Sequence, residues 1–290
     1  MPLERALREH FAGASWGAVR KLVATGKVSI DGKLQMDGRT VVPARATIEL
    51  AMNAPRKKPS LQAPERGILY LDPYVVVVNK AAGVASVDHV REATSLQTEL
   101  RATLEQLERR KLPPLHIVHR LDKVTSGVML FARSKSIQHA LKAQFKAKTT
   151  GRYYLALAHG EVHDGTLRFR LVRDRGDGIR GITHDATQGY PSVTHVTALE
   201  QSARCTLIRC KLETGRTHQI RIHLAAIGHP LLGETVYIRD YENPIPCSRT
   251  LLHAAFLSFE HPVHQQRFEY EAPLPDSFQT VLDQERRRRR

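Results

Sequence analysis

The chain has few cysteines and no long apolar run. Its three cysteines, Cys205, Cys210 and Cys247, are odd in number and form no C-x-x-C pair, which argues against both a disulfide scaffold and a zinc site. The longest apolar runs, residues 75–78 and 128–132, are far shorter than the roughly 20 residues that span a bilayer. The first 14 residues lack the apolar core of a secretory signal, so we expect a cytoplasmic protein with no membrane partner.

Acidic side chains are too few to balance the basic ones. The 290 residues include 44 Lys and Arg against 29 Asp and Glu, which gives a formal net charge of +15. This balance predicts a polyanionic partner, and a hydrophobic content of 41% excludes disorder for most of the chain. Residues 1–60 hold 11 basic and 5 acidic side chains, and residues 286–290 are all arginine. We expect the arginine run to be a solvated, frayed tail.

A basic, proline-containing segment divides the chain. Residues 53–66 contain three prolines and show no apolar periodicity, so they predict a linker. The linker separates a small domain, residues 1–52, from a large domain, residues 67–285. The arginine tail, residues 286–290, follows the large domain.

The small domain has the pattern of two helices followed by a hairpin. Apolar residues at helical spacing predict a helix near residues 3–11 and a second between Ser15 and Gly26. Asp31-Gly32 is typical of a hairpin turn, and residues 41–50 supply further strand surface, including Val41. Four basic side chains cluster around the second helix and the turn: Arg20, Lys21, Lys27 and Lys33.

A polar helix face explains this basic cluster as well as RNA binding does. The order of elements, with SWGAVRKLVATGKVSIDGK in the middle, resembles the alpha-L type RNA-binding module shared with a small-subunit ribosomal protein. This resemblance implies that the four basic residues bind RNA.

The large domain contains a carboxylate between two strand patterns. In HIVHRLDKVTSGVMLFARS, residues 116–134, the alternation ends at Leu121, breaks at residues 122–127 and resumes at Val128. A strand, a polar loop and a second strand would hold Asp122 at a rigid corner facing a cleft. Strand-end carboxylates often only cap a turn, however, so Asp122 alone does not establish a site. Upstream, residues 74–78 predict a strand in the sheet interior and residues 94–110 a helix.

Two later segments add candidate residues. RYYLALAHG, residues 152–160, predicts a strand, and residues 213–237 predict a strand, a turn at Gly215 and a helix over 217–228 capped by Thr217. Arg221 lies beside the apolar stripe of that helix, where it can reach inward. His218 and His223 are five residues apart, about 140° around a helix, so one metal ion cannot easily bind both.

These segments together resemble the RluA-type pseudouridine synthases. HRLDKVTSGVMLFARS, RYYLALAHG, GRTHQIRIHLAAIGHPLLGETVY and LLHAAFLSF follow the order of that family, after VVVVNKAAGVAS as the opening strand and loop. The resemblance covers about residues 67–282. It implies an α+β fold with a central mixed, largely antiparallel sheet, flanking helices and a central cleft. It also implies an isomerase that needs no organic cofactor and no metal.

The resemblance assigns three residues to catalysis. Asp122 corresponds to the catalytic aspartate, which attacks the sugar carbon or removes a sugar proton; the sequence does not choose between these routes. Arg221 corresponds to the arginine that pairs with the aspartate and keeps it ionised. Tyr154 would stack on the uracil and help with the proton lost from the ring carbon. Tyr153 should point to the other face of its strand and serve in packing.

Two further residues are expected to contact the substrate nucleotide. Arg120 matches the family arginine that enters the space left by the extruded nucleotide, and Leu252 would cover the side of the base opposite Tyr154. His119 is expected to be a structural hydrogen-bonding residue. The chain departs from the family where alanine follows Lys80 in place of proline, where Glu234 replaces a commoner aspartate, and in the Gly-rich residues 174–196, a candidate lid over RNA.

We therefore expect a monomeric RNA pseudouridine synthase that acts on large-subunit ribosomal RNA. Transfer RNA is the alternative substrate, since enzymes that modify it share the motifs. A non-catalytic RNA-binding or ribosome-assembly protein is an alternative of another class, although retention of Asp122, Tyr154 and Arg221 favours the enzyme. A DNA-binding regulator fits the charge, but the sequence has no helix-turn-helix or zinc pattern.

Overall fold

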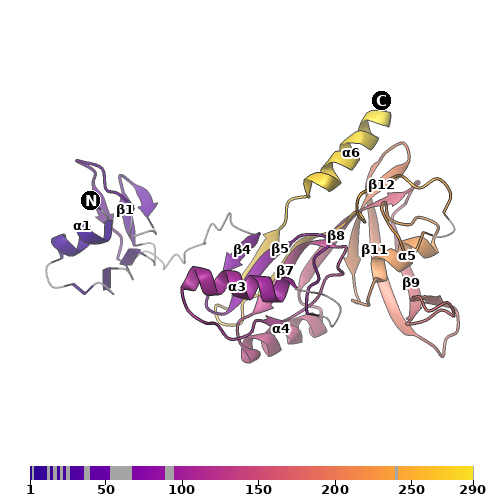
Figure 1. Cartoon of the computed structure of the whole chain (residues 1–290), viewed down its shortest axis with the longest axis horizontal. Helices are drawn as coiled ribbons and strands as arrows, with labels where there is room; N and C mark the ends of the chain where they lie inside the picture. The colour runs from indigo at the N-terminus through magenta and orange to yellow at the C-terminus, as the bar shows by residue number, and fades with distance from the viewer. Residues whose placement is uncertain are drawn as a thin grey trace. The chain divides into compact units, whose positions relative to one another are not determined.

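The chain divides into two compact units, Met1–Gln62 and Ala63–Arg290, each with its own apolar core (Figure 1). The computed structural model describes residues 1, 3–11, 14, 15, 18, 19, 22, 23, 27–35, 40–52, 67–88, 95–238 and 241–289. The predicted linker, residues 53–66, lies outside the described residues. No helix in the described part is long and apolar enough to cross a membrane.

The small unit combines helix α1, Leu3–His10, with a three-stranded antiparallel sheet in the order β2-β1-β3. The strands are β1 Val28–Ile30, β2 Lys33–Gln35 and β3 Ile48–Leu50. Asp31 and Gly32 join β1 to β2 with φ angles of 48° and 74°, so the predicted hairpin turn is confirmed. The core contains Leu3, Leu7, Val19, Val23, Val28 and Ile30. Val41, expected to contribute strand surface, is 67% exposed.

The large unit is built on one eleven-stranded sheet with the order β10-β9-β11-β12-β8-β13-β7-β5-β4, in which β14 pairs with β13 and β6 with β7 (Figure 1). Its described strand pairs are antiparallel except for β7 and β13, which run parallel. Together with its helices, the sheet confirms the predicted α+β fold with a mixed, largely antiparallel sheet.

The elements of the large unit have the following bounds. The strands are β4 Ile68–Leu71, β5 Val75–Lys80, β6 His116–Ile117, β7 Ser126–Ala132, β8 Gly151–His159, β9 Gly165–Val172, β10 Gly181–Thr183, β11 Tyr190–Gln201, β12 Cys205–Leu212, β13 Leu252–Glu260 and β14 Arg267–Glu271. The helices are α3 Leu96–Glu108, α4 Lys135–Ala147, α5 Gln219–Ala226 and α6 Asp276–Arg289.

Strand β5 is buried on both faces, as its unbroken apolar run predicts. Val76 and Val78 pack in the cluster that includes Leu100 and Leu104 of α3. Val75 and Val77 pack in a second cluster with Ile137 and Leu141 of α4. These two clusters place α3 and α4 on opposite faces of this half of the sheet.

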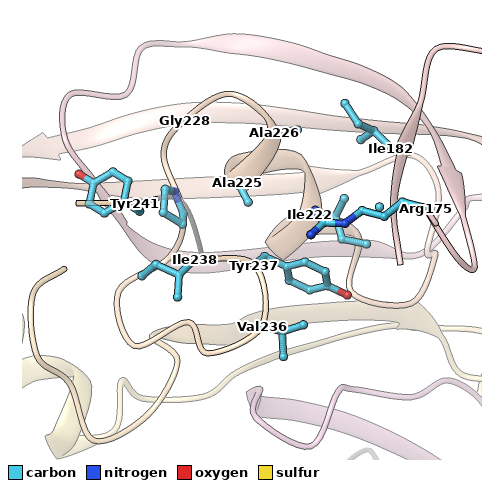
Figure 2. A pocket seen from close by; sticks show the side chains of 12 residues that line it. Arg175, Ile182, Ile222, Ala225, Ala226, Gly228, Val236, Tyr237, Ile238 and Tyr241 are labelled. Atoms are coloured by element: carbon cyan, nitrogen blue, oxygen red, sulfur yellow. The ribbon is translucent and has the colours of Figure 1, made fainter. Parts of the chain in front are cut away.

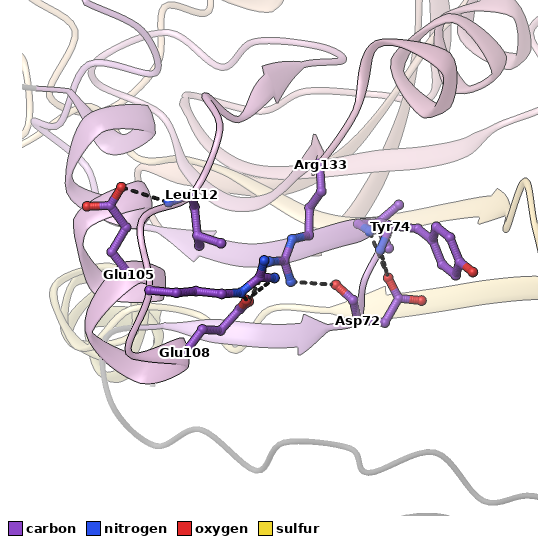
Figure 3. Close-up of polar contacts among 8 residues, drawn as sticks. Asp72, Tyr74, Glu105, Glu108, Leu112 and Arg133 are labelled. Atoms are coloured by element: carbon purple, nitrogen blue, oxygen red, sulfur yellow. Dashed lines mark hydrogen bonds and ion pairs between the residues drawn. The ribbon is translucent and has the colours of Figure 1, made fainter.

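Arg133, just beyond the end of β7, joins three elements of this half (Figure 3). Its guanidinium bonds Glu108 at the end of α3 and donates to the carbonyl of Asp72 at 2.9 Å. The Asp72 carboxylate in turn accepts the backbone N–H of Tyr74 at 2.7 Å, which fixes the β4–β5 turn. These contacts anchor one end of β7, whose other end begins shortly after Asp122.

The arginine run differs from its prediction. Helix α6 extends through Arg289, so residues 286–289 are not a frayed tail. The reason is charge pairing over a long sequence separation: Arg286 donates to both carboxylate oxygens of Glu200, at 2.8 and 2.6 Å, and to Asp283 at 2.9 Å. The Gly-rich residues 174–196 contain regular structure, because β10 and the first residues of β11 both pair with β9.

Candidate active site

Asp122 lies in the turn between β6 and β7, and hydrogen bonds fix the backbone on both sides of it. On the N-terminal side, Ser86 Oγ donates to the carbonyl of Leu121 at 2.7 Å and accepts its N–H at 3.2 Å. On the C-terminal side, the ammonium of Lys80 and the N–H of Gly83 both donate to the carbonyl of Lys123, at 3.2 and 2.8 Å. The predicted rigid corner is therefore present, held by the loop that follows β5.

Lys80 organises that loop from inside the unit. Its side chain is 1% exposed, and its ammonium also donates to the carbonyls of Ala81 and Val84, at 3.0 and 2.8 Å. Burial lowers the pKa of Lys80 to about 8; repulsion by Arg249 adds to this effect, and attraction by Asp122 opposes it. Three carbonyl acceptors hold the loop, although it lacks the proline that the family usually has after the lysine.

A cleft of about 700 Å³ opens at Asp122. Of the described residues that line it, Asp122 has the only carboxylate. Five cationic side chains share the lining: Arg120, Lys123, Arg152, Arg180 and Arg216. The cleft therefore presents one anionic group inside a cationic surface, which suits a polyanionic ligand.

Tyr154 and Leu252 reach the cleft from the neighbouring strands β8 and β13. Leu252 is paired with Ala156, two residues after Tyr154, so both side chains lie on the same face of the sheet. Burial raises the pKa of Tyr154, with attraction by Arg152 opposing and the Asp122 charge adding to the shift. Tyr153 behaves as predicted for the other face: it stacks on Phe256 at 5.2 Å.

Arg221 does not form the predicted ion pair with Asp122. Its Nε and Nη2 each donate to a carboxylate oxygen of Glu234 at 2.7 Å, and the two side chains are 3% and 0% exposed. Glu234 Oε1 also accepts the N–H groups of Thr235 and Val236, at 3.0 and 2.9 Å. The residue that departs from the family pattern thus supplies the bidentate partner. Asp122 still contributes to the raised pKa of Arg221, but only as a more distant charge.

His218 is a site residue that the sequence reasoning missed. Helix α5 begins at Gln219 rather than Thr217, and His218 precedes it with φ 58°. Its Nε2 lies 3.9 Å from Asp122 Oδ1, and its Nδ1 lies 2.7 Å from the hydroxyl of Tyr237. Burial lowers the pKa of His218, and the Asp122 charge opposes this shift. His223 faces elsewhere: its Nε2 lies 2.8 Å from Ser192 Oγ.

Arg120 and His119 are adjacent but differ in their surroundings. Arg120 is exposed at the cleft. Its role in filling the space left by the extruded nucleotide stays a prediction. His119 Nε2 accepts the N–H of Leu130 at 3.1 Å, and its ring stacks on Phe145 at 4.9 Å, which confirms a structural residue. Burial and the charge of Arg152 lower the pKa of His119 to about 3, so this imidazole is neutral.

The four basic residues assigned to RNA in the small unit are only partly described. Arg20 and Lys21 lie outside the described residues. The Lys27 ammonium donates to the carbonyl of Met52, and the Lys33 side chain is exposed next to the hairpin turn. RNA binding by this unit stays a prediction.

A second pocket, of about 350 Å³, borders α5 (Figure 2). Ile222 and Ala225 of α5, Ile182 of β10 and Tyr237 contribute to its lining. Ile220, by contrast, lines the Asp122 cleft. The helix therefore presents different side chains to the two cavities.

One group of metal-ligand side chains occurs among the described residues: Asp72, His261 and His264. The two imidazoles stack at 4.2 Å with 14° between their planes. His261 Nδ1 accepts the N–H groups of Val263 and His264, which leaves the proton of a neutral ring on Nε2, 3.0 Å from Asp72 Oδ2. This arrangement fits an Asp–His contact better than a bound metal.

Comparison with known families agrees with the geometry of the cleft. Residues 74–226, which include Asp122, Tyr154 and Arg221, match the model of the RNA pseudouridylate synthase family. The chain belongs to this family. The predicted family resemblance is therefore confirmed for the large unit.

The chain is similar to ribosomal large subunit pseudouridine synthase D of Neisseria meningitidis serogroup A, with 39% identity over 74% of this chain. The chain spans 60% of the length of that relative. The corresponding synthase D of Vibrio parahaemolyticus is 33% identical over 97% of this chain and 90% of its own length. The fold is that of human RNA pseudouridylate synthase domain containing 4, with a TM-score of 0.62, 24% identity, and coverage of 76% of this chain and 93% of that one.

Proposed function

We propose that the chain is an RNA pseudouridine synthase that isomerises uridines in large-subunit ribosomal RNA. The observation that carries this proposal is Asp122, the lone carboxylate among the described lining residues of a cationic cleft, with Tyr154 and Leu252 beside it. Membership of the RNA pseudouridylate synthase family supports the reaction. The synthase D relatives, named for the large ribosomal subunit, support the substrate.

The reaction breaks the bond between uracil N1 and the sugar, turns the base, and forms a bond from uracil C5 to the same sugar carbon. The C5 proton is then lost and N1 is protonated, so no electrons are gained or lost overall. Asp122 starts the process either by attacking the sugar carbon or by removing a sugar proton. Its fixed backbone keeps the carboxylate directed into the cleft, which limits the entropy lost when the nucleotide binds.

Tyr154 and Leu252 would hold the uracil between them. Burial raises the pKa of Tyr154 and so disfavours its phenolate form, and the side chain would act by stacking and by hydrogen bonding. Arg221, paired with Glu234, affects Asp122 through its longer-range field.

Arg120 would occupy the space that the target nucleotide leaves in the RNA. Extruding a stacked base costs a few kcal/mol, and an exposed guanidinium at the cleft can offset part of that cost. The other cations of the cleft would contact phosphates. Residues 1–52 would add affinity as an alpha-L type module through Lys27 and Lys33, with Arg20 and Lys21 as further candidates.

The test is carbodiimide mapping of pseudouridines in total RNA from cells with and without the gene. Loss of one or more modified positions from large-subunit ribosomal RNA is expected, with recovery when the gene is returned. Loss confined to transfer RNA would refute the substrate and retain the reaction. An unchanged map would refute the proposed function.

A further inference from the structure

An exposed aromatic ring contacts a cationic residue that lines the Asp122 cleft. Tyr190, the first residue of β11, is 55% exposed. The guanidinium carbon of Arg216 lies 5.1 Å from the centre of its ring, and Arg216 itself lines the cleft. Arg216 is exposed, so its charge is available to an incoming anion.

The backbone that carries Tyr190 is fixed. Gly189, which precedes it, has φ +68°, and an added Cβ there would lie 2.8 Å from the carbonyl oxygen of Leu171. Arg170 donates from its guanidinium to the carbonyls of Gln188 and Gly189, at 2.6 and 3.0 Å. Tyr190 also pairs with Leu171 across the β9–β11 ladder. The backbone of Tyr190 is therefore held in a defined position.

The turn that carries Arg216 is fixed as well. Gln219, which is 2% exposed, accepts the N–H of Arg216 at 3.0 Å and the hydroxyl of Thr214 at 2.7 Å with the same amide oxygen. Its amide nitrogen donates to the carbonyl of Val193 in β11, the strand that begins with Tyr190. The two halves of the ring–guanidinium pair are thus connected by buried hydrogen bonds, and little ordering remains to be done when a ligand binds.

We propose that Tyr190, with Arg216 stacked on it, is a platform for an unpaired nucleobase of the RNA next to the target nucleotide. The inference rests on the proposed function. Extruding the target removes a stacking partner from its neighbours, and an exposed aromatic ring that contacts a cleft residue can replace it. Every base has a flat face, so the platform adds affinity without selecting a sequence. Arg216 supplies a cation for the nearby phosphates.

The first experiment measures kcat and KM with a uridine-tritiated transcript of large-subunit ribosomal RNA. Tyr190→Ala should raise KM by about 5- to 150-fold, the loss of one stacked base, and leave kcat nearly unchanged. Tyr190→Phe should behave as wild type because it keeps the ring. Leu199→Ala is the matched control, since Leu199 is 40% exposed on the same strand but lies nine residues from Tyr190, near the other end of β11. Equal KM values for Tyr190→Ala and Leu199→Ala would overturn the platform.

The second experiment measures binding of the same transcript at several salt concentrations, in an Asp122→Asn background that cannot turn over. Tyr190→Ala should weaken binding without changing the slope of log affinity against log salt, because stacking releases no counterions. Arg216→Ala should reduce the slope by roughly 0.7 to 0.9. Unweakened binding by Tyr190→Ala would refute the platform. If the wild-type chain forms no pseudouridine while Tyr190→Ala still weakens binding, the proposed function fails and the platform stands.

Discussion

Replacing Glu234 with glutamine should destabilise the large unit strongly. Glu234 is fully buried, and its two oxygens accept Nε and Nη2 of Arg221, which is itself 3% exposed. Burial opposes the charge on Glu234, but the Arg221 guanidinium outweighs it and keeps the pKa of this carboxyl below its ordinary value. Glutamine would turn an amide donor toward a guanidinium that can only donate, and would leave the Arg221 charge without its counterion.

The magnitude follows from the burial of the pair. Removing one partner of a buried ion pair costs about 3 to 5 kcal/mol. For a unit as large as Ala63–Arg290, each kcal/mol corresponds to roughly 2 to 4 °C in melting temperature, so Glu234→Gln should lower Tm by about 6 to 20 °C. Glu161→Gln, an exposed carboxylate of the same unit, should change stability by less than about 0.5 kcal/mol.

Urea unfolding of the full chain, followed by circular dichroism, measures this effect. The double variant Arg221→Met/Glu234→Leu replaces the pair with apolar groups and should be more stable than Glu234→Gln, since no buried charge is left unpaired. A loss below about 1 kcal/mol for Glu234→Gln, or a double variant less stable than Glu234→Gln, would refute the buried-pair reasoning.

Three further predictions concern catalytic activity, stability in acid and the packing of β7 against β13. The Arg221→Met/Glu234→Leu variant should fold yet lose tritium release, because the cation whose field reaches Asp122 is gone; retained activity would assign Arg221 a purely structural role. Burial of Asp72 opposes its ionisation, but His261 and backbone N–H groups outweigh burial and lower the pKa of this carboxyl. The ionised carboxylate therefore stabilises the fold above about pH 4, and this stability should be lost as the pH falls through the lowered pKa, with a smaller loss in Asp72→Asn. Equal dependence of stability on acid pH in the two proteins would contradict this prediction. Gly127→Ala should prevent folding or cost several kcal/mol, because the added Cβ would lie 2.1 Å from the carbonyl oxygen of Ala254, and a Tm within a few degrees of wild type would contradict the close β7–β13 approach.

Regular elements with a strong local pattern could be predicted from the sequence. The apolar run of β5 predicted a strand buried on both faces, and α3 and α4 cover those faces. Asp31-Gly32 predicted a hairpin turn because two adjacent positive φ angles are easiest for these residues. Local signals of this kind depend only on neighbours in the chain.

The details of the site could not be predicted, because they depend on contacts between distant segments. The partner of Arg221 is decided by the loop that places Glu234 beside α5, 13 residues further along the chain. His218 reaches Asp122 because it adopts a left-handed conformation before the helix, which helical periodicity does not reveal. Arg286 is ordered by Glu200, a residue 86 positions away. Family motifs identified the residue types at the site, whereas the structure supplied their partners.

The most direct test of the central claim compares wild type with Asp122→Asn in a tritium-release assay on large-subunit ribosomal RNA labelled at uracil C5. The amide keeps the shape of the carboxylate but is neither nucleophile nor base, so release should fall by at least about 100-fold. Tm and RNA affinity should change little, since the Asp122 side chain lies at the cleft and the loop bonds are made by backbone groups. Release by wild type that is abolished in Asp122→Asn supports the account. Comparable release by both proteins would contradict it.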